Sequence, residues 1–120
     1  MQPMLNIALR AARSAGELII RSIERLDVIS VNEKDAHDYV SEVDRAAEQT
    51  IIQALQKAYP THGFLGEEGG SIAGSGDGAD YQWIIDPLDG TTNFLRGVPH
   101  FAVSIACKYR GRLEHAVVLD

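Results

Sequence analysis

The first part of the chain shows the hydrophobic periodicity of a long amphipathic helix, which we expect from Pro3 to about Glu24. Apolar residues recur every three or four positions, while Arg10, Arg13 and Glu17 fall on the opposite face. This spacing matches the period of an α-helix with one buried face. The apolar stripe comprises Met4, Ala8, Ala11, Ala15, Leu18, Ile19 and Ile23.

A second helix is expected from Ser41 to the Tyr59-Pro60 pair, because proline does not continue a helix. Its apolar stripe comprises Val43, Ala47, Ile51, Ala54, Leu55 and Ala58. Between the two helices, Val28 to Val31 predicts a short strand, and the polar run Asn32 to Asp38 predicts a mobile loop. Two helices of similar length favour an antiparallel pair packed against a sheet.

The second half of the chain contains the patterns of β-strands. A short strand is predicted at residues 63–66 and a buried one before Asp86, separated by a glycine-rich stretch, residues 66–80, that we expect to be a flexible loop. Residues 101–109 and 113–119 alternate in polarity around a tight Arg110-Gly111 turn, which predicts a hairpin. These patterns favour an α+β class, with two long antiparallel helices on a largely antiparallel sheet, over a doubly wound parallel sheet.

Composition limits the classes to which the protein can belong. Its 120 residues, 45% of them hydrophobic, suffice for one domain, and the formal net charge of −6 argues against a general electrostatic grip on nucleic acid phosphates. The single cysteine, Cys107, excludes an internal disulfide and suits a reducing compartment. No apolar run approaches the roughly 18 residues of a membrane span. We therefore expect a cytoplasmic protein with no membrane partner.

Residues 83–94 carry most of the candidate chemistry. They read Trp-Ile-Ile-Asp-Pro-Leu-Asp-Gly-Thr-Thr-Asn-Phe, so Asp86 ends a strand pattern and Asp89 follows across a proline-containing turn. Carboxylates are preferred ligands of Mg²⁺. Gly90 allows the backbone to approach a ligand closely, and Thr91 begins a run that favours a helix start, where free N–H groups bind phosphate. The segment predicts a joint cation and phosphate site, with a plain turn as the alternative.

Other acidic residues could converge on this segment, although each has a simpler interpretation. Glu67 and Glu68 border the glycine-rich stretch and could be solvated surface residues. Asp44 lies three residues after Ser41, which is the spacing of a helix capping box, and considered alone it fits a cap better than a ligand. Lys34 could approach a phosphate but fits a solvated lysine better. The histidines show no zinc-type spacing, and no covalent nucleophile is recognisable.

The segment at residues 83–94 resembles the first sequence motif of the inositol monophosphatase family. Gly-Glu-Glu at 66–68 and Val-Asp at 43–44 are similar to the other early acidic motifs of that family, and the resemblance runs through essentially all 120 residues. It implies the layered αβαβα fold of magnesium-dependent, lithium-sensitive sugar phosphatases. Residues 1–120 would then form a single domain that is the N-terminal portion of this fold, with the C-terminal portion absent.

The resemblance also implies a set of metal ligands. Glu67 and Asp86 would bind one Mg²⁺ together with the main-chain carbonyl of Leu88. Asp86 and Asp89 would bind a second Mg²⁺. These are oxygen ligands throughout, as expected for a hard cation.

The remaining site residues would act on the substrate and the attacking water. Asp44 and Thr91 would orient the water and help to deprotonate it, while the N–H groups of Gly90 and Thr91 would hold the substrate phosphate. On these grounds we expect a phosphomonoesterase that hydrolyses inositol monophosphate or a similar small sugar phosphate. Related enzymes that cleave fructose bisphosphate or a nucleotide phosphate are an alternative.

The opening residues, Met-Gln-Pro-Met-Leu-Asn-Ile-Ala-Leu-Arg-Ala-Ala-Arg, are similar to those of a bacterial branch of the family that is also linked to ribosomal RNA transcription and antitermination. A second possible function is therefore a binding module that associates with RNA polymerase or antitermination factors. Family members are much longer and carry a second motif, Trp-Asp followed by small residues, which this chain lacks. We expect these residues alone to bind Mg²⁺ weakly and to lack useful phosphatase activity, and the full-length protein to be a homodimer.

Overall fold

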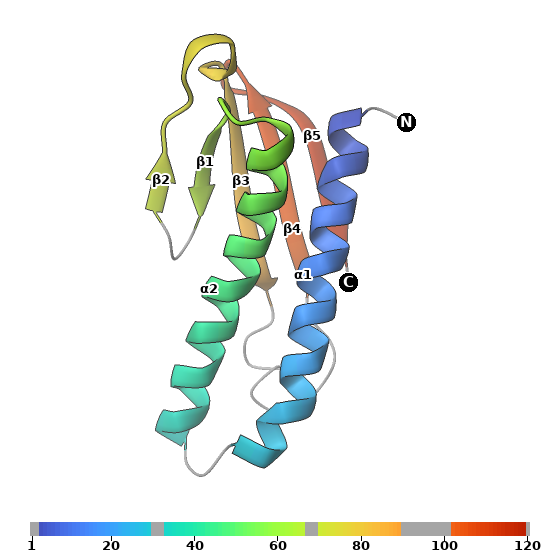
Figure 1. The fold of residues 1–120 in the computed structure, drawn as a ribbon, viewed down its shortest axis with the longest axis vertical. Coiled ribbons are helices and arrows are strands. Elements are labelled where there is room, and N and C mark those ends of the chain that lie inside the picture. The colour runs from blue at the N-terminus through green and yellow to red at the C-terminus, as the bar shows by residue number, and fades with distance from the viewer. Residues whose placement is uncertain (1–2, 30–32, 67–69, 90–101, 120) are drawn as a thin grey trace.

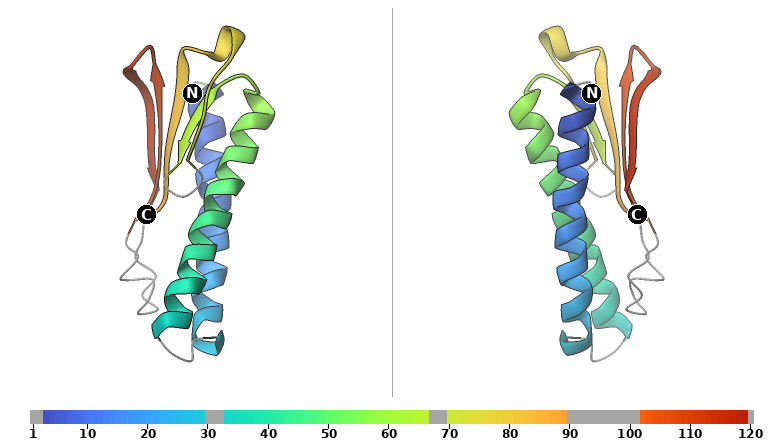
Figure 2. Two further views of the ribbon diagram at one scale, coloured as in Figure 1. Left: turned by 90° about the vertical axis from the view of Figure 1, so that its left-hand side faces the viewer. Right: turned by 90° about the vertical axis from the view of Figure 1, so that its right-hand side faces the viewer.

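Two long helices lie side by side on one face of a twisted sheet (Figures 1 and 2). A computed structural model of the chain describes residues 3–29, 33–66, 70–89 and 102–119. Helix α1 covers Pro3–Ile29, and helix α2 covers Glu33–Ala58 and runs antiparallel to α1. Neither helix, over its described residues, combines the length and the apolar composition needed to cross a membrane.

The sheet has five strands in the order β2-β1-β3-β4-β5. Strands β1 and β3 pair in parallel, and every other neighbouring pair is antiparallel. This mixed, mostly antiparallel sheet with helices on one face confirms the predicted α+β class. The strands are β1 (Gly63–Gly66), β2 (Gly70–Ile72), β3 (Tyr81–Asp89), β4 (Ala102–Tyr109) and β5 (Arg112–Leu119), and a short 3-10 helix spans Gly76–Gly78.

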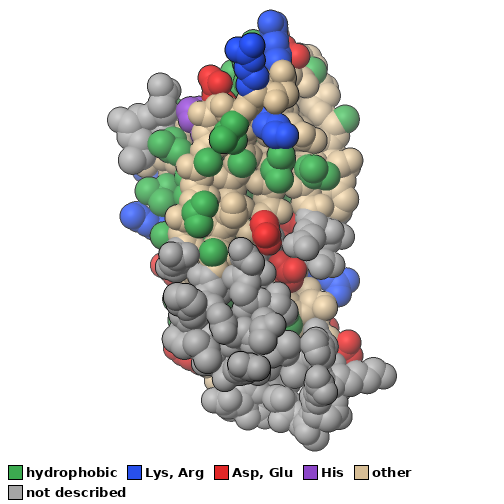
Figure 3. Space-filling view, turned by 180° about the vertical axis from the view of Figure 1, so that it is seen from behind, with side chains coloured by type: hydrophobic (Ala, Val, Ile, Leu, Met, Phe, Trp, Pro, Cys, Tyr) green, Lys and Arg blue, Asp and Glu red, His purple; other side chains and the backbone are tan. Residues whose placement is uncertain are grey.

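The hydrophobic core lies between the helices and the sheet. Small residues of α1, including Ala8 and Ala15, are fully buried, and they allow the helix to pack closely on the sheet, mainly on β5 and β4. Because side chains alternate between the two faces of a strand, the buried Trp83 and Ile85 point toward the helices, and Ile84 and Asp86 lie on the opposite face. Hydrophobic side chains are scattered over that opposite face in Figure 3.

The boundary between the two helices differs from the sequence prediction. Val28 and Ile29 belong to α1 and not to a strand, and residues 33–38 form the first turns of α2 and not a mobile loop. Strand propensity reflects packing on a sheet, whereas these residues extend a helix that is already formed. Because α2 begins at Glu33, Ser41 lies inside the helix, and the capping-box interpretation of Asp44 is wrong.

The strand region also contains corrections. The glycine-rich stretch includes β2 and the 3-10 helix, so it is not simply a loop. Strand β3 does not end at Asp86 but continues to Asp89, with a register shift between these two residues. The predicted turn is therefore a bulge, which is a position where a strand tolerates a proline.

The predicted hairpin of β4 and β5 is confirmed. Its connection is the Arg110-Gly111 pair, and both residues have positive φ angles, 52° and 80°. Two positive φ angles are typical of the tight turn that matches the twist of the flanking strands.

A stack of rings surrounds His62 at the start of β1. The imidazole lies between Tyr59 and Tyr81, with centroid separations of 4.7 and 4.3 Å. The Nε1–H group of Trp83 donates a hydrogen bond of 3.0 Å to Nδ1 of His62, so this nitrogen is unprotonated. Burial lowers the pKa of His62, because a buried imidazolium loses hydration.

This environment predicts that acid destabilises the fold through His62. Below a pH of about 6.5 the unfolded chain protonates His62 while the folded chain does not, so stability falls as the pH drops toward the lowered folded-state pKa. His62→Phe should remove this contribution. At neutral pH it should also cost about 1–3 kcal/mol, because Trp83 Nε1–H loses its acceptor.

Urea denaturation at pH 7.5 and pH 5.0 measures both effects. The difference in unfolding free energy between wild type and the His62→Phe variant should shrink at the lower pH. A difference that is the same at both pH values would contradict a neutral, buried His62.

Candidate metal and phosphate site

The candidate site is built on the carboxyl ends of the parallel strands β1 and β3. Gly66, the last residue of β1, is the register partner of Ile85 in β3. In the sequence, Glu67 directly follows Gly66 and Asp86 directly follows Ile85. Glu67 itself lies outside the described residues, so its predicted role as a ligand stays a prediction.

Asp86 is half-buried at this end of the sheet, on the face away from the helices. Its register partner on β4 is Ser104, and beyond the bulge Asp89 is the register partner of Ala102. The register of β3 against β4 shifts between these two acidic residues, so Asp86 lies before the bulge and Asp89 after it. The side chains of Leu88 and Asp89, and all of Gly90 and Thr91, lie outside the described residues, so their predicted roles are not tested.

Asp44 lies on α2, one helical turn before Glu48, whose carboxyl group lies against Gly66 at the end of β1. Asp44 is half-buried, and its Oδ1 atom is inaccessible to solvent. One turn later on the same helix face, Glu48 is only 1% exposed. Glu48 was not singled out in the sequence analysis. The signal that could have revealed it is a charged residue between Ala47 and Ile51, on the helix face that otherwise buries apolar side chains.

The described carboxylates thus approach the end of the sheet from two sides. Asp44 and Glu48 lie on the helix side, and Asp86 lies on the opposite face. Within the described part of the chain, no group of three or more acidic, histidine or cysteine side chains is close enough to hold a metal ion. The donors that are described are nevertheless carboxylate oxygens, which fit Mg²⁺ better than a softer transition metal.

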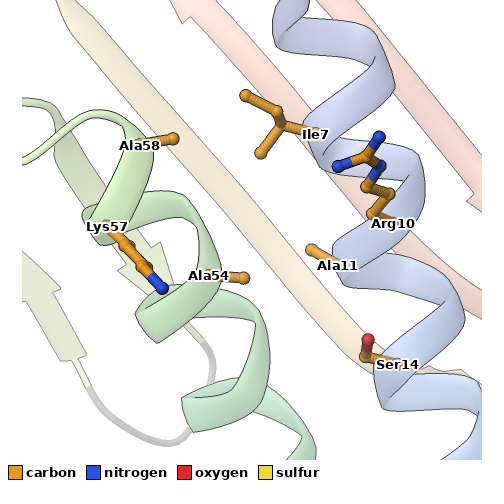
Figure 4. Close-up of a pocket in the computed structure, with 7 residues that line it drawn as sticks. All are labelled: Ile7, Arg10, Ala11, Ser14, Ala54, Lys57 and Ala58. Carbon is orange, nitrogen blue, oxygen red and sulfur yellow. The ribbon is translucent and has the colours of Figure 1, made fainter.

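Two hollows among the described residues lie elsewhere. A groove of about 280 Å³ separates α1 from α2, lined by small side chains with Arg10 on one helix and Lys57 on the other (Figure 4). A second hollow of about 400 Å³ includes Asp80 and Arg110, which form an exposed ion pair at 3.2 Å that raises the pKa of Arg110. Neither contains a predicted site residue. We place the candidate chemistry at the end of the sheet, because the half-buried and buried carboxylates are there.

Cys107 does not contribute a reactive thiol. It is completely buried in β4, and burial raises its pKa to about 11. The thiolate, which is the nucleophilic form, is therefore scarce at neutral pH.

Comparison with known proteins gives a consistent match over the whole chain. Residues 1–120 match the model of the inositol monophosphatase family. The chain is 86% identical to the Nus factor SuhB of Pseudomonas aeruginosa and 52% identical to that of Escherichia coli K12, over 100% of this chain and 44% of each relative. These SuhB proteins are the bacterial branch that the opening residues predicted.

Solved structures agree with this match. The extragenic suppressor protein suhB from Bartonella henselae superimposes with a TM-score of 0.82 at 40% identity, over 98% of this chain and 43% of that chain. The inositol monophosphatase from Anabaena superimposes with a TM-score of 0.71 at 31% identity, over 97% of this chain and 39% of that chain. The chain spans less than half the length of all four relatives.

Proposed function

Because the chain belongs to the inositol monophosphatase family, we propose that the complete protein containing it is a Mg²⁺-dependent phosphomonoesterase. Its substrate would be inositol monophosphate or a similar small sugar phosphate. Residues 1–120 would form the N-terminal portion of its layered domain. The observation that supports this most is the Gly66–Ile85 register pair, because it joins the two strands whose next residues are Glu67 and Asp86.

In this proposal the acidic residues at the end of the sheet hold the cations. Asp86 would be a ligand of both ions, with Glu67 and the Leu88 carbonyl completing one set and Asp89 contributing to the other. Bound Mg²⁺ would supply charge stabilisation for the phosphoryl oxygens and lower the pKa of a coordinated water. Asp86 suits the role because it is half-buried, so water screens its charge only in part.

The other residues would bind the phosphate and move a proton. The main-chain N–H groups of Gly90 and Thr91 would donate hydrogen bonds to the phosphate oxygens. Asp44, with its Oδ1 atom enclosed, would accept a hydrogen bond from the attacking water through its carboxylate and, with Thr91, help to remove its proton. The rigid helix α2 would keep this carboxylate in place.

Phosphate release by the complete protein tests the proposal. Inositol 1-phosphate should be hydrolysed with Mg²⁺ present, and a chelator should abolish the reaction until Mg²⁺ is restored. Fructose 1,6-bisphosphate and a nucleotide 3′-phosphate are the comparison substrates. Faster release from either would assign the protein to another enzyme of the superfamily, and no Mg²⁺-dependent release from any of the three would contradict the proposal.

A binding role is the second candidate, because the relatives at 86% and 52% identity are named Nus factors. In that role the protein would associate with RNA polymerase or antitermination factors. Asp89→Asn should abolish phosphate release in the complete protein and leave such binding unchanged, if binding uses another surface. Loss of both properties together would place them at one site.

A further inference from the structure

Glu48 is an unusual residue for the position it occupies. Its side chain is 1% exposed, on a helix face that otherwise buries apolar residues such as Ile51 and Leu55. Burial of a carboxylate costs free energy unless its surroundings compensate for the lost hydration. A carboxyl group buried at this position therefore needs a structural reason, which its neighbours can supply.

The neighbour of the Glu48 carboxyl group is Gly66. A Cβ atom added at Gly66 would overlap with Oε1 and Cδ of Glu48 and would lie 3.2 Å from Cγ. The carboxyl group thus occupies the space where any other residue at position 66 would place its side chain. Gly66 is buried, so the displaced carboxyl group could not simply move into solvent.

Gly66 is also the point at which β1 meets the proposed metal site. It is the last residue of β1, it lies opposite Ile85, and the residues that follow these two in the sequence are Glu67 and Asp86. A small movement of the main chain at Gly66 would change the direction in which the chain leaves the strand. Metal sites depend on such supporting contacts as well as on the ligands themselves.

We propose that Glu48 is a positioning residue, whose buried carboxyl group packs against Gly66 and fixes the end of β1 immediately before Glu67. This inference rests on the proposed function, because it assigns Glu48 to the support of that metal site. Glu48 acts through packing on the main chain of Gly66 and is not itself a ligand. The role of Glu48 is therefore different from that of Asp44, which would orient the attacking water.

Direct binding of Mn²⁺ to the complete protein, followed by electron paramagnetic resonance, tests the inference without relying on catalysis. Glu48→Ala should weaken Mn²⁺ binding about 10- to 100-fold, which is typical when a supporting group of a metal site is lost. Gly66→Ala should weaken it similarly, because the new methyl group displaces the same carboxyl group. The double variant should be little worse than either single variant, since both remove one contact.

Two further variants separate positioning from general destabilisation and from charge. Ile51→Val removes a buried methyl group on the same helix without touching Gly66 and should leave Mn²⁺ binding within about twofold of wild type. Glu48→Gln preserves the shape of the side chain and should restore binding to within about threefold, as expected if packing is what matters.

The outcomes distinguish the inference from the proposed function. A wild-type protein that binds no Mn²⁺ would overturn both. Normal Mn²⁺ binding by wild type and by folded Glu48→Ala would overturn the positioning role alone. Equal losses in Glu48→Gln and Glu48→Ala would also overturn it, because they would show that the charge of Glu48 is required and not its contact with Gly66.

Discussion

Replacing Asp86 with asparagine in the complete protein is expected to lower kcat/KM for phosphate release roughly 1000-fold while the fold is retained. Asparagine keeps the size of the side chain but removes the charge of the ligand proposed to be shared by both cations. A metal ion contributes several kcal/mol to transition-state stabilisation, and about 4 kcal/mol corresponds to a factor of about 1000. Steady-state kinetics with saturating Mg²⁺, together with a thermal melt, measures both parts of the prediction.

Asp80→Asn is the matched control for this variant. Asp80 is exposed at the other end of β3 and pairs with Arg110, so the same chemical change there should alter phosphate release less than about twofold. An Asp86→Asn protein that keeps a tenth or more of wild-type activity would remove Asp86 from the proposed ligand set.

The second large effect concerns stability and is expected at Gly78. Gly78→Ala should lower the free energy of unfolding of the chain by about 3 kcal/mol. Gly78 is buried, and a Cβ atom there would overlap with the carbonyl carbon, the carbonyl oxygen and Oγ1 of Thr61. The same carbonyl accepts a 2.8 Å hydrogen bond from the N–H of Ser75, so the main chain cannot yield without losing this bond.

Gly16→Ala should change stability in the opposite direction. Gly16 is buried in the middle of α1, and among the described residues an added Cβ would meet Leu119 alone, at an ordinary contact distance of 3.9 Å. Alanine is favoured over glycine in a helix by about 1 kcal/mol, so this variant should be more stable than wild type. Urea denaturation of both variants checks the prediction, and a shift of the same sign in both would contradict it.

Much of the fold could be predicted from local patterns. The stripes of α1 and α2 and the alternation in β4 and β5 each reflect one buried face of a regular element. The Arg110-Gly111 turn was recognisable from Gly111, which readily adopts a positive φ angle, whereas the positive φ of Arg110 is uncommon for a residue other than glycine. These features depend on residues that are close together in the sequence.

The errors arose where distant contacts override local preference. Val28 and Ile29 are β-branched, yet they extend α1, and among the described residues no strand pairs with them. Asp86 precedes a proline, which suggested a strand end, but pairing with β4 carries β3 onward through a bulge to Asp89. The local sequence alone predicts neither the helical conformation of Val28 and Ile29 nor the extension of β3 to Asp89.

The candidate site was predictable in part for the same reason. Residues 83–94 form a contiguous motif, so their chemistry could be inferred directly. The position of Gly66 beside this segment depends on the parallel pairing of β1 with β3, and α2, which carries Asp44, packs against β3. Glu48 could not be assigned from the sequence, because its meaning comes from its contact with Gly66 across that packing.

An NMR titration of the chain with Mg²⁺ would show whether the end of the sheet near Asp86 is a cation site. Amide resonances of Gly66, Ile85, Asp86 and Ser104 should shift the most, and traces of Mn²⁺ should broaden the same resonances. Weak binding is sufficient for this measurement, because fast exchange still reports the location. Shifts confined to the region of Asp80 and Arg110, or no localised shift at all, would show that no cation binds near Asp86.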